Sequence, residues 1–323
     1  MALVCATALA GCKKDGGAGG GSASGSSGSG SASASGSGSA SGSAGSASGT
    51  TGGGATAPTD KPGLTVLDQG AEPRVQLQYK IAPGTKQDFN LSVDMNMDMG
   101  SAMGGKMKLP SMQMDGAVAF DAATADGGMP YKLTTSKLGF VDTPGAAVPA
   151  AMINDKLKGM QNMVATGTLA PNGHVSDFKI DMAGAPPEVQ QTLSGLKQSY
   201  DQMVTQLPDQ PIGKGGKWQV VQQIDQNGIK AQQTAVFEVV DISGSTVKLK
   251  STIALTAPAQ KMTQGAVTAD LKRMAGTGSA DMTLDLTKLI GPTEMTLHID
   301  EEMSAMGQSI NMAMDMVMKM SPK

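Results

Sequence analysis

The sequence of 323 residues is short of the side chains that most catalytic and metal sites use. It holds 2 Cys and 2 His, and both cysteines, Cys5 and Cys12, lie in the first twelve residues. The rest of the chain therefore has no disulfide and no thiolate ligand for zinc. A nucleophilic triad would need His174 or His298, and no Gly-x-Ser-x-Gly elbow accompanies either. We expect a protein that is not an enzyme and that holds no metal or other cofactor.

Aromatic and charged residues are also scarce. The chain has 1 Trp, 3 Tyr and 5 Phe, 16% charged residues and a net charge of −3. Its basic residues do not cluster with aromatic ones, which argues against a nucleic-acid partner. Paired acids such as Glu301 and Glu302 could serve glycoside hydrolysis, but such sites usually include aromatic sugar platforms. We interpret these acids, with Asp94, Asp98 and Asp115, as solvated.

No stretch of the sequence is long and apolar enough for a transmembrane helix, which needs about 20 residues. The first twelve residues are a short apolar run that ends in small residues, as export signals do. The segment Leu9-Ala10-Gly11-Cys12 resembles the lipobox of bacterial lipoproteins. This resemblance implies that residues 1–11 are a signal peptide and that Cys12 carries the lipid of a membrane-anchored N-terminus, residues 12–15.

The resemblance also implies a location in the bacterial cell envelope. No Asp directly follows Cys12, and such an Asp would favour retention in the inner membrane. We therefore expect the outer membrane, on its periplasmic face or at the cell surface, with the lipid anchor as the contact to the membrane.

The segment after Cys12 is of low complexity. Residues 16–57 contain only Gly, Ser, Ala and Thr, so they have no apolar side chains to bury. We expect a disordered linker over residues 16–60, with a mean span of about 35 Å. It would hold the folded domain, expected over residues 74–320, clear of the membrane.

Strict alternation of apolar and polar residues dominates that domain. Phe89, Leu91 and Val93 begin one alternating run, and a second extends from Ile310 to Met320. Because side chains i and i+2 share a face of a strand, each run predicts an antiparallel strand with one buried face. Turn signals such as Asn172-Gly173 separate the runs. We expect about twelve strands in a mainly β, antiparallel, barrel-like or half-barrel sheet.

Helix is predicted at two places. Apolar residues at spacings of three and four predict one amphipathic helix near residues 187–207. A shorter segment, 150–159, is either a helix or an irregular loop. The halves of the domain before and after residues 187–207 look faintly alike, which indicates either two pseudo-repeated halves or a chance similarity of alternating strands.

The domain contains an early hairpin from Tyr79 to Gly84, a Gly-x-x-Trp step from Gly215 to Trp218, and alternating Met/Thr strands. In these features it resembles an uncharacterised family of secreted β-rich lipoproteins, a domain of unknown function. A looser likeness is to half-barrel lipoprotein carriers. That likeness implies a curved sheet and a helix that enclose an apolar cavity.

Methionine, with 25 residues, supplies much of the apolar content. The methionines of the two runs and the stripe of the predicted helix are our candidates for an apolar cavity or a core: Met95, Met97, Met99, Met112, Met114, Met312, Met314, Met316, Met318, Val189, Leu193, Leu196, Tyr200 and Met203. Flexible thioethers suit a packed core, an apolar ligand cavity, or a Cu(I)/Ag(I) site.

These observations leave three functions open. We expect a non-enzymatic binding or carrier module for an apolar small molecule or lipid. One alternative is a structural envelope lipoprotein that interacts with a protein partner. A lesser alternative is a methionine-rich protein that binds Cu(I) or Ag(I).

Overall fold

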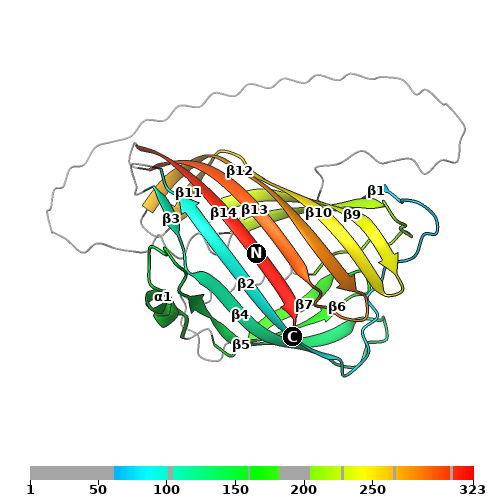
Figure 1. Ribbon diagram of the computed structural model, residues 1–323. Helices are drawn as coiled ribbons and strands as arrows, with labels where there is room; N and C mark the ends of the chain where they lie inside the picture. The colour runs from blue at the N-terminus through cyan, green and yellow to red at the C-terminus, as the bar shows by residue number, and fades with distance from the viewer. Residues whose placement is uncertain are drawn as a thin grey trace, which may run out of the picture.

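The computed structural model describes residues 62–100, 105–158, 161–181, 204–226, 229–264, 267–305 and 308–323. In these residues it has fourteen strands and one short helix (Figure 1). The strands are β1 (Gly63–Asp68), β2 (Lys86–Asp98), β3 (Lys106–Lys108), β4 (Ser111–Phe120), β5 (Met129–Val141), β6 (Val164–Leu169), β7 (Val175–Asp181), β8 (Lys217–Gln226), β9 (Ile229–Ser243), β10 (Thr246–Ala257), β11 (Gln260–Gln264), β12 (Val267–Asp285), β13 (Thr293–Ala305) and β14 (Gln308–Pro322). The helix is α1 (Ala150–Leu157).

All these strands belong to one antiparallel sheet, as the alternation predicts. Its order is β1-β8-β9-β10-β12-β13-β14-β2-β4-β5-β6-β7, with β11 beside β12 and β3 beside β2. The mainly β antiparallel fold is confirmed, with fourteen strands where about twelve were expected. The sheet curves strongly (Figure 1). It stays open, because within the described residues the edge strands β1 and β7 do not pair with each other.

The two halves of the sequence form the two halves of this sheet. Strands β2 to β7 lie together on one side and β8 to β14 on the other, while β1 pairs with β8 at the far edge. The halves join where β14 pairs with β2. We call this junction the seam. Strand β1 lies before residue 74, so the sheet includes residues N-terminal to the expected domain boundary.

The alternating residues define an inner face on the concave side of the sheet. On β2, Phe89, Leu91 and Val93 are buried, while Asp94 between two apolar neighbours is exposed. Buried apolar residues of strands from both halves form one core cluster. Each strand therefore contributes one apolar row to the inner face and one polar row to the outer face.

One end of the curved sheet, which we call the closed end, is sealed by the segments 75–81 and 204–212. The Tyr79 amide donates to the Pro171 carbonyl at 2.8 Å, and the Leu207 amide donates to the Asn172 carbonyl at 2.8 Å. The indole nitrogen of Trp218 donates to the Gln206 carbonyl at 2.9 Å. Leu77, Leu207 and Trp218 are at most 2% exposed, so this end is tightly packed.

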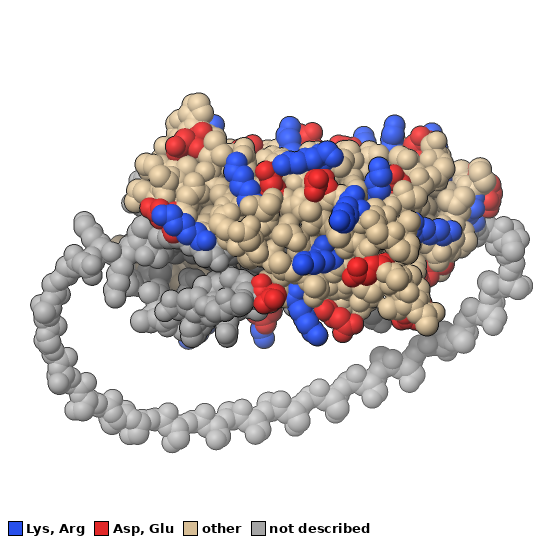
Figure 2. All heavy atoms as spheres, turned by 90° about the horizontal axis from the view of Figure 1, so that it is seen from below, with Lys and Arg blue, Asp and Glu red and all other residues tan. Residues whose placement is uncertain are grey.

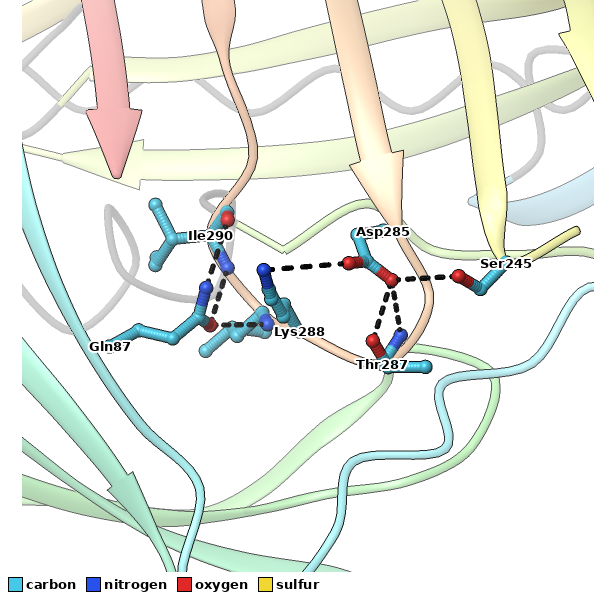
Figure 3. A network of polar contacts seen from close by, with 7 residues as sticks. Gln87, Ser245, Asp285, Thr287, Lys288 and Ile290 are labelled. Atoms are coloured by element: carbon cyan, nitrogen blue, oxygen red, sulfur yellow. Dashed lines mark hydrogen bonds and ion pairs between the residues drawn. The ribbon is translucent and has the colours of Figure 1, made fainter. Parts of the chain in front are cut away.

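The loop between β12 and β13 also closes this end (Figure 3). The Gln87 side chain accepts from the Leu289 amide at 2.8 Å and donates to the Ile290 carbonyl at 3.2 Å. Asp285 accepts from the Thr287 hydroxyl at 2.7 Å and from Ser245 at 3.1 Å. The Gln87 bonds tie this loop to β2 of the other half, whereas the Asp285 bonds tie it to the turn between β9 and β10.

Helix α1 lies near the opposite end of the sheet, beside β5 (Figure 1). It confirms the shorter predicted helix, and Asn154 holds it by donating to the Phe140 carbonyl at 2.8 Å. The predicted helix near 187–207 lies outside the described residues up to 203, and residues 204–207 are not helical. In the described part of the chain, no helix has the length and hydropathy to cross a membrane.

Candidate functional site

The two methionine runs of the sequence meet at the seam. Met95 lies opposite Met316 and Met97 lies opposite Met314, in one continuous antiparallel register between β2 and β14. Directly opposite residues on an antiparallel pair share a face, so these four side chains form one patch on the inner face. The sequence alone indicated the face of each run, and the pairing of β2 with β14 brings the two runs together.

The residues that the sequence predicted for an apolar cavity or core differ in burial. Met95, Met114, Met314 and Met316 are buried at 2–7% exposure. Met97, Met99, Met112, Met312 and Met318 are half-buried. The candidates Val189, Leu193, Leu196, Tyr200 and Met203 lie outside the described residues, as does Cys12. The methionines of the two runs therefore include both packed core residues and accessible ones.

One group of accessible methionines belongs to the end of the sheet where β2 ends and β14 begins, at the upper left of Figure 1. We call this group the methionine end, and it consists of half-buried side chains from five strands and an adjoining loop: Met97, Met99, Met107, Met262, Met303 and Met312. Met97 and Met107 are opposite each other on β2 and β3. Met303 lies opposite Leu271 on β12 and Ile310 on β14. The methionine end is opposite the closed end along the strands.

A second group of half-buried methionines lies further toward the closed end. Met295 on β13 is opposite Met318 on β14, and Met282 accepts from the Thr205 hydroxyl at a sulfur distance of 3.9 Å. Half-buried methionines thus occur at two levels of the inner face. An apolar face with flexible, partly accessible side chains can adapt to an apolar molecule.

Glu301 also lies on the inner face. The sequence had led us to predict that it is solvated, and this prediction was wrong. On β13 it has the same orientation as Leu297 and Ile299, which are at most 5% exposed. It lies opposite Met274 on β12 and Met312 on β14. Desolvation in these surroundings raises the pKa of Glu301 above its ordinary value.

Glu301 lies within the acidic run 300–302, and such a run favours a solvent-exposed interpretation. Its alternation with Leu297 and Ile299 could have predicted that it lies on the inner face. Its neighbours Asp300 and Glu302 are exposed on the outer face, as we expected for Glu302. The structure therefore places one carboxyl of the three among the methionines and two in solvent.

The outer face has the properties of an ordinary solvated surface. His298 bonds Asp315 at 2.7 Å and Asp300 at 3.3 Å, and its hydrogen bond to Asp315 raises its pKa. Lys and Arg are interspersed with Asp and Glu on the face shown in Figure 2. An open hollow over β10, β12, β13 and β14 is lined by charges of both signs, and Lys319 there pairs with Glu294 at 2.9 Å.

A metal centre built on His or carboxylates finds no support in the described part of the chain. No three His, Cys, Asp or Glu side chains gather there in a group that could hold a metal ion. Most of the described methionine side chains belong to the apolar core of the inner face or pack against it. The inner face is therefore the candidate functional site, and its chemistry is apolar with one carboxyl.

Comparison with protein families assigns no activity to this site. Residues 190–288 match a family of unknown function, DUF6263. This segment includes β8 to β11 and all of β12, and it ends before Glu301 and the C-terminal methionine run. A search of curated proteins gives no match to the chain. The match fits our expectation of an uncharacterised family.

Proposed function

We propose that this protein is a non-enzymatic carrier that binds an apolar small molecule or lipid on the inner face of its sheet. The observation that supports the proposal is the contrast between the two ends. The closed end is sealed by Leu77, Leu207 and Trp218, whereas the other end is lined by half-buried methionines. A sheet that served only as a scaffold would gain stability by packing both ends alike.

Burial of an apolar ligand there would remove the remaining methionine surface from water. Each Å² of apolar surface so buried contributes roughly 25 cal/mol, before the cost of association is subtracted. Methionine has three rotatable bonds and a polarisable sulfur, so one lining can fit several ligand shapes. This favours a ligand class, such as molecules with an alkyl chain, over a single rigid compound.

Uptake of a neutral dye whose fluorescence rises in apolar surroundings tests this proposal. We expect saturable binding to the full chain, and weaker binding by Met97→Gln and Met312→Gln because an amide replaces a thioether of similar length. Met152→Gln is the matched control, since Met152 on α1 is 62% exposed. Absence of saturable uptake by the wild-type protein would contradict the carrier proposal. A protein neighbour crosslinked in cells would then favour the structural alternative.

We further propose that a lipid on Cys12 anchors this carrier in the bacterial outer membrane, with residues 16–60 as the tether. Two or more acyl chains anchor a protein stably, whereas one chain binds a membrane marginally. Cys12→Ala should release the protein from the membrane fraction and abolish labelling by a radioactive fatty acid, while Cys5→Ala leaves both unchanged. Membrane association of the Cys12→Ala protein would refute the anchor.

A further inference from the structure

Glu301 is the ionisable group that the carrier proposal leaves unexplained. Its four nearest neighbours on the inner face are Ile299 and Met303 along β13, Met274 on β12 and Met312 on β14. All four are apolar. No hydrogen bond or ion pair joins the Glu301 carboxyl to another residue that the structure describes.

A carboxyl in such surroundings is costly because burial removes water from the charged form without a compensating partner. The polar side chains that the described core buries are uncharged: Gln87, Ser111, Thr135, Gln219 and Ser251. The nearby Arg273 is exposed and lies opposite Glu302, so that cation is on the outer face. Nothing in the four neighbouring positions offsets a negative charge at Glu301.

The position of Glu301 matters as much as its charge. Met303 and Met312 belong to the methionine end, so the carboxyl borders the accessible surface rather than the sealed core. Ligand sites are mostly apolar with a few polar groups that fix the orientation of the ligand. A carboxyl beside an apolar lining is the complement of an amphiphile with a positive head group and an alkyl tail.

We infer that the ligand of the inner face carries an amine, and that its ammonium group pairs with the Glu301 carboxylate while its alkyl chain lies along the methionines. This inference rests on the proposed function and names the ligand class. The ammonium would supply the opposite charge and hydrogen-bond donors that this carboxyl lacks among the described residues. Desolvation raises the pKa of Glu301, as expected for a buried carboxyl whose charged form has no partner among the described residues.

Competition between three probes with the same twelve-carbon tail tests the inference: dodecylamine, dodecanol and dodecyl sulfate displace the neutral dye from the full-length protein. The two charged probes are used below their critical micelle concentrations, and dodecanol is used below its solubility limit. Dodecylamine should bind about tenfold or more tighter than dodecanol, because charge-assisted hydrogen bonds are the stronger kind. Dodecyl sulfate should bind more weakly than dodecanol, since its charge repels the carboxylate.

Glu301→Gln should remove the preference for dodecylamine and leave dodecanol binding within about twofold, because the amide keeps the shape of the side chain and loses the charge. Glu302→Gln is the matched control on the outer face and should keep the preference. Glu301→Met, which matches the apolar neighbours, provides a second variant in case the amide does not fold.

The outcomes separate the inference from the proposed function. Equal binding of dodecylamine and dodecanol by the wild-type protein overturns the amine inference and leaves the carrier intact. A preference for dodecylamine that survives both Glu301 variants also overturns it. If none of the probes displaces the dye and the dye itself does not bind, the carrier proposal fails.

Discussion

Met316 lies directly opposite Met95 across the seam, and the two side chains are 3% and 2% exposed. Two residues more than two hundred positions apart in the sequence thus form one contact in the centre of the sheet. The contact joins the half that contains β2 to β7 with the half that contains β8 to β14. The contribution of this contact to the stability of the fold can be measured separately from that of the accessible methionines.

Met316→Ala should lower the free energy of unfolding by about 2–5 kcal/mol, because it leaves a cavity in a packed core. Met312→Ala on the same strand should cost less, since its side chain is half-buried. Urea unfolding followed by Trp218 fluorescence measures both. Equal losses in the two variants would show that the seam is no better packed than the methionine end.

Glu301 should make stability depend on pH in the ligand-free protein. Its pKa is raised in the folded state, so the folded protein holds a proton that the unfolded chain has already released. The stabilising contribution of this proton is complete below the ordinary Glu pKa of about 4.5 and is lost as the pH rises through the folded-state pKa. We therefore expect Glu301→Gln to be more stable than the wild type at neutral pH.

The difference between Glu301→Gln and the wild type should shrink as the pH falls toward 4.5, which thermal unfolding over a pH series can measure. Glu302→Gln, on the outer face, is the control. A constant difference across the series would mean that Glu301 titrates as it does in the unfolded chain.

His298 should titrate above its ordinary pKa of 6.5 because of its hydrogen bond to Asp315. Its ion pairs stabilise the fold fully below pH 6.5 and fade as the pH rises through the folded-state pKa. Asp315→Asn should lower the His298 pKa, as followed by NMR of the imidazole ring. Because the pair is exposed, we expect only a small change in stability. An unchanged pKa in Asp315→Asn would assign the shift to another group.

Gly173→Ala should lower the free energy of unfolding by disturbing the packing of the closed end. Gly173 has a φ of +82°, and an added Cβ would lie 2.4 Å from the Thr205 carbonyl oxygen. Gly215→Ala is a matched control, with a φ of +79° and nothing within 4 Å of the added Cβ. The backbone strain of about 1–2 kcal/mol is common to both variants, so the excess loss in Gly173→Ala measures the contact with Thr205. Equal stabilities of the two variants would mean that segment 204–212 moves away without cost.

The sequence predicted the inner face of the sheet well, because a strand repeats every two residues and the phase of each run is independent of its partners. The faces of β2 and β14 follow from that rule, and so does the exposed position of His298. The pairing of β14 with β2 could not be read in the same way, since alternating strands all resemble one another and register depends on contacts across the whole sheet.

The sequence pattern indicated a curved, barrel-like or half-barrel sheet, but it could not predict the difference between the two ends of that sheet. Leu77 and Leu207 lie in segments without regular secondary structure, so no periodic pattern in the sequence predicts that they are buried at the closed end. Glu301 was mispredicted for a different reason. Its alternation with apolar residues indicated the inner face, but the acidic neighbours on both sides favoured a surface interpretation.

The seam has a consequence for how the protein is made. Strand β14 is the last strand in chain order, yet it lies in the middle of the sheet between β13 and β2. During synthesis β2 therefore emerges long before the strand that covers this edge, and its long-range pairing is intrinsically slow. Until then its row of Phe89, Leu91, Val93 and Met95 borders an unpaired backbone edge that another chain could occupy. Newly made chains should need protection from aggregation until β14 has been translated.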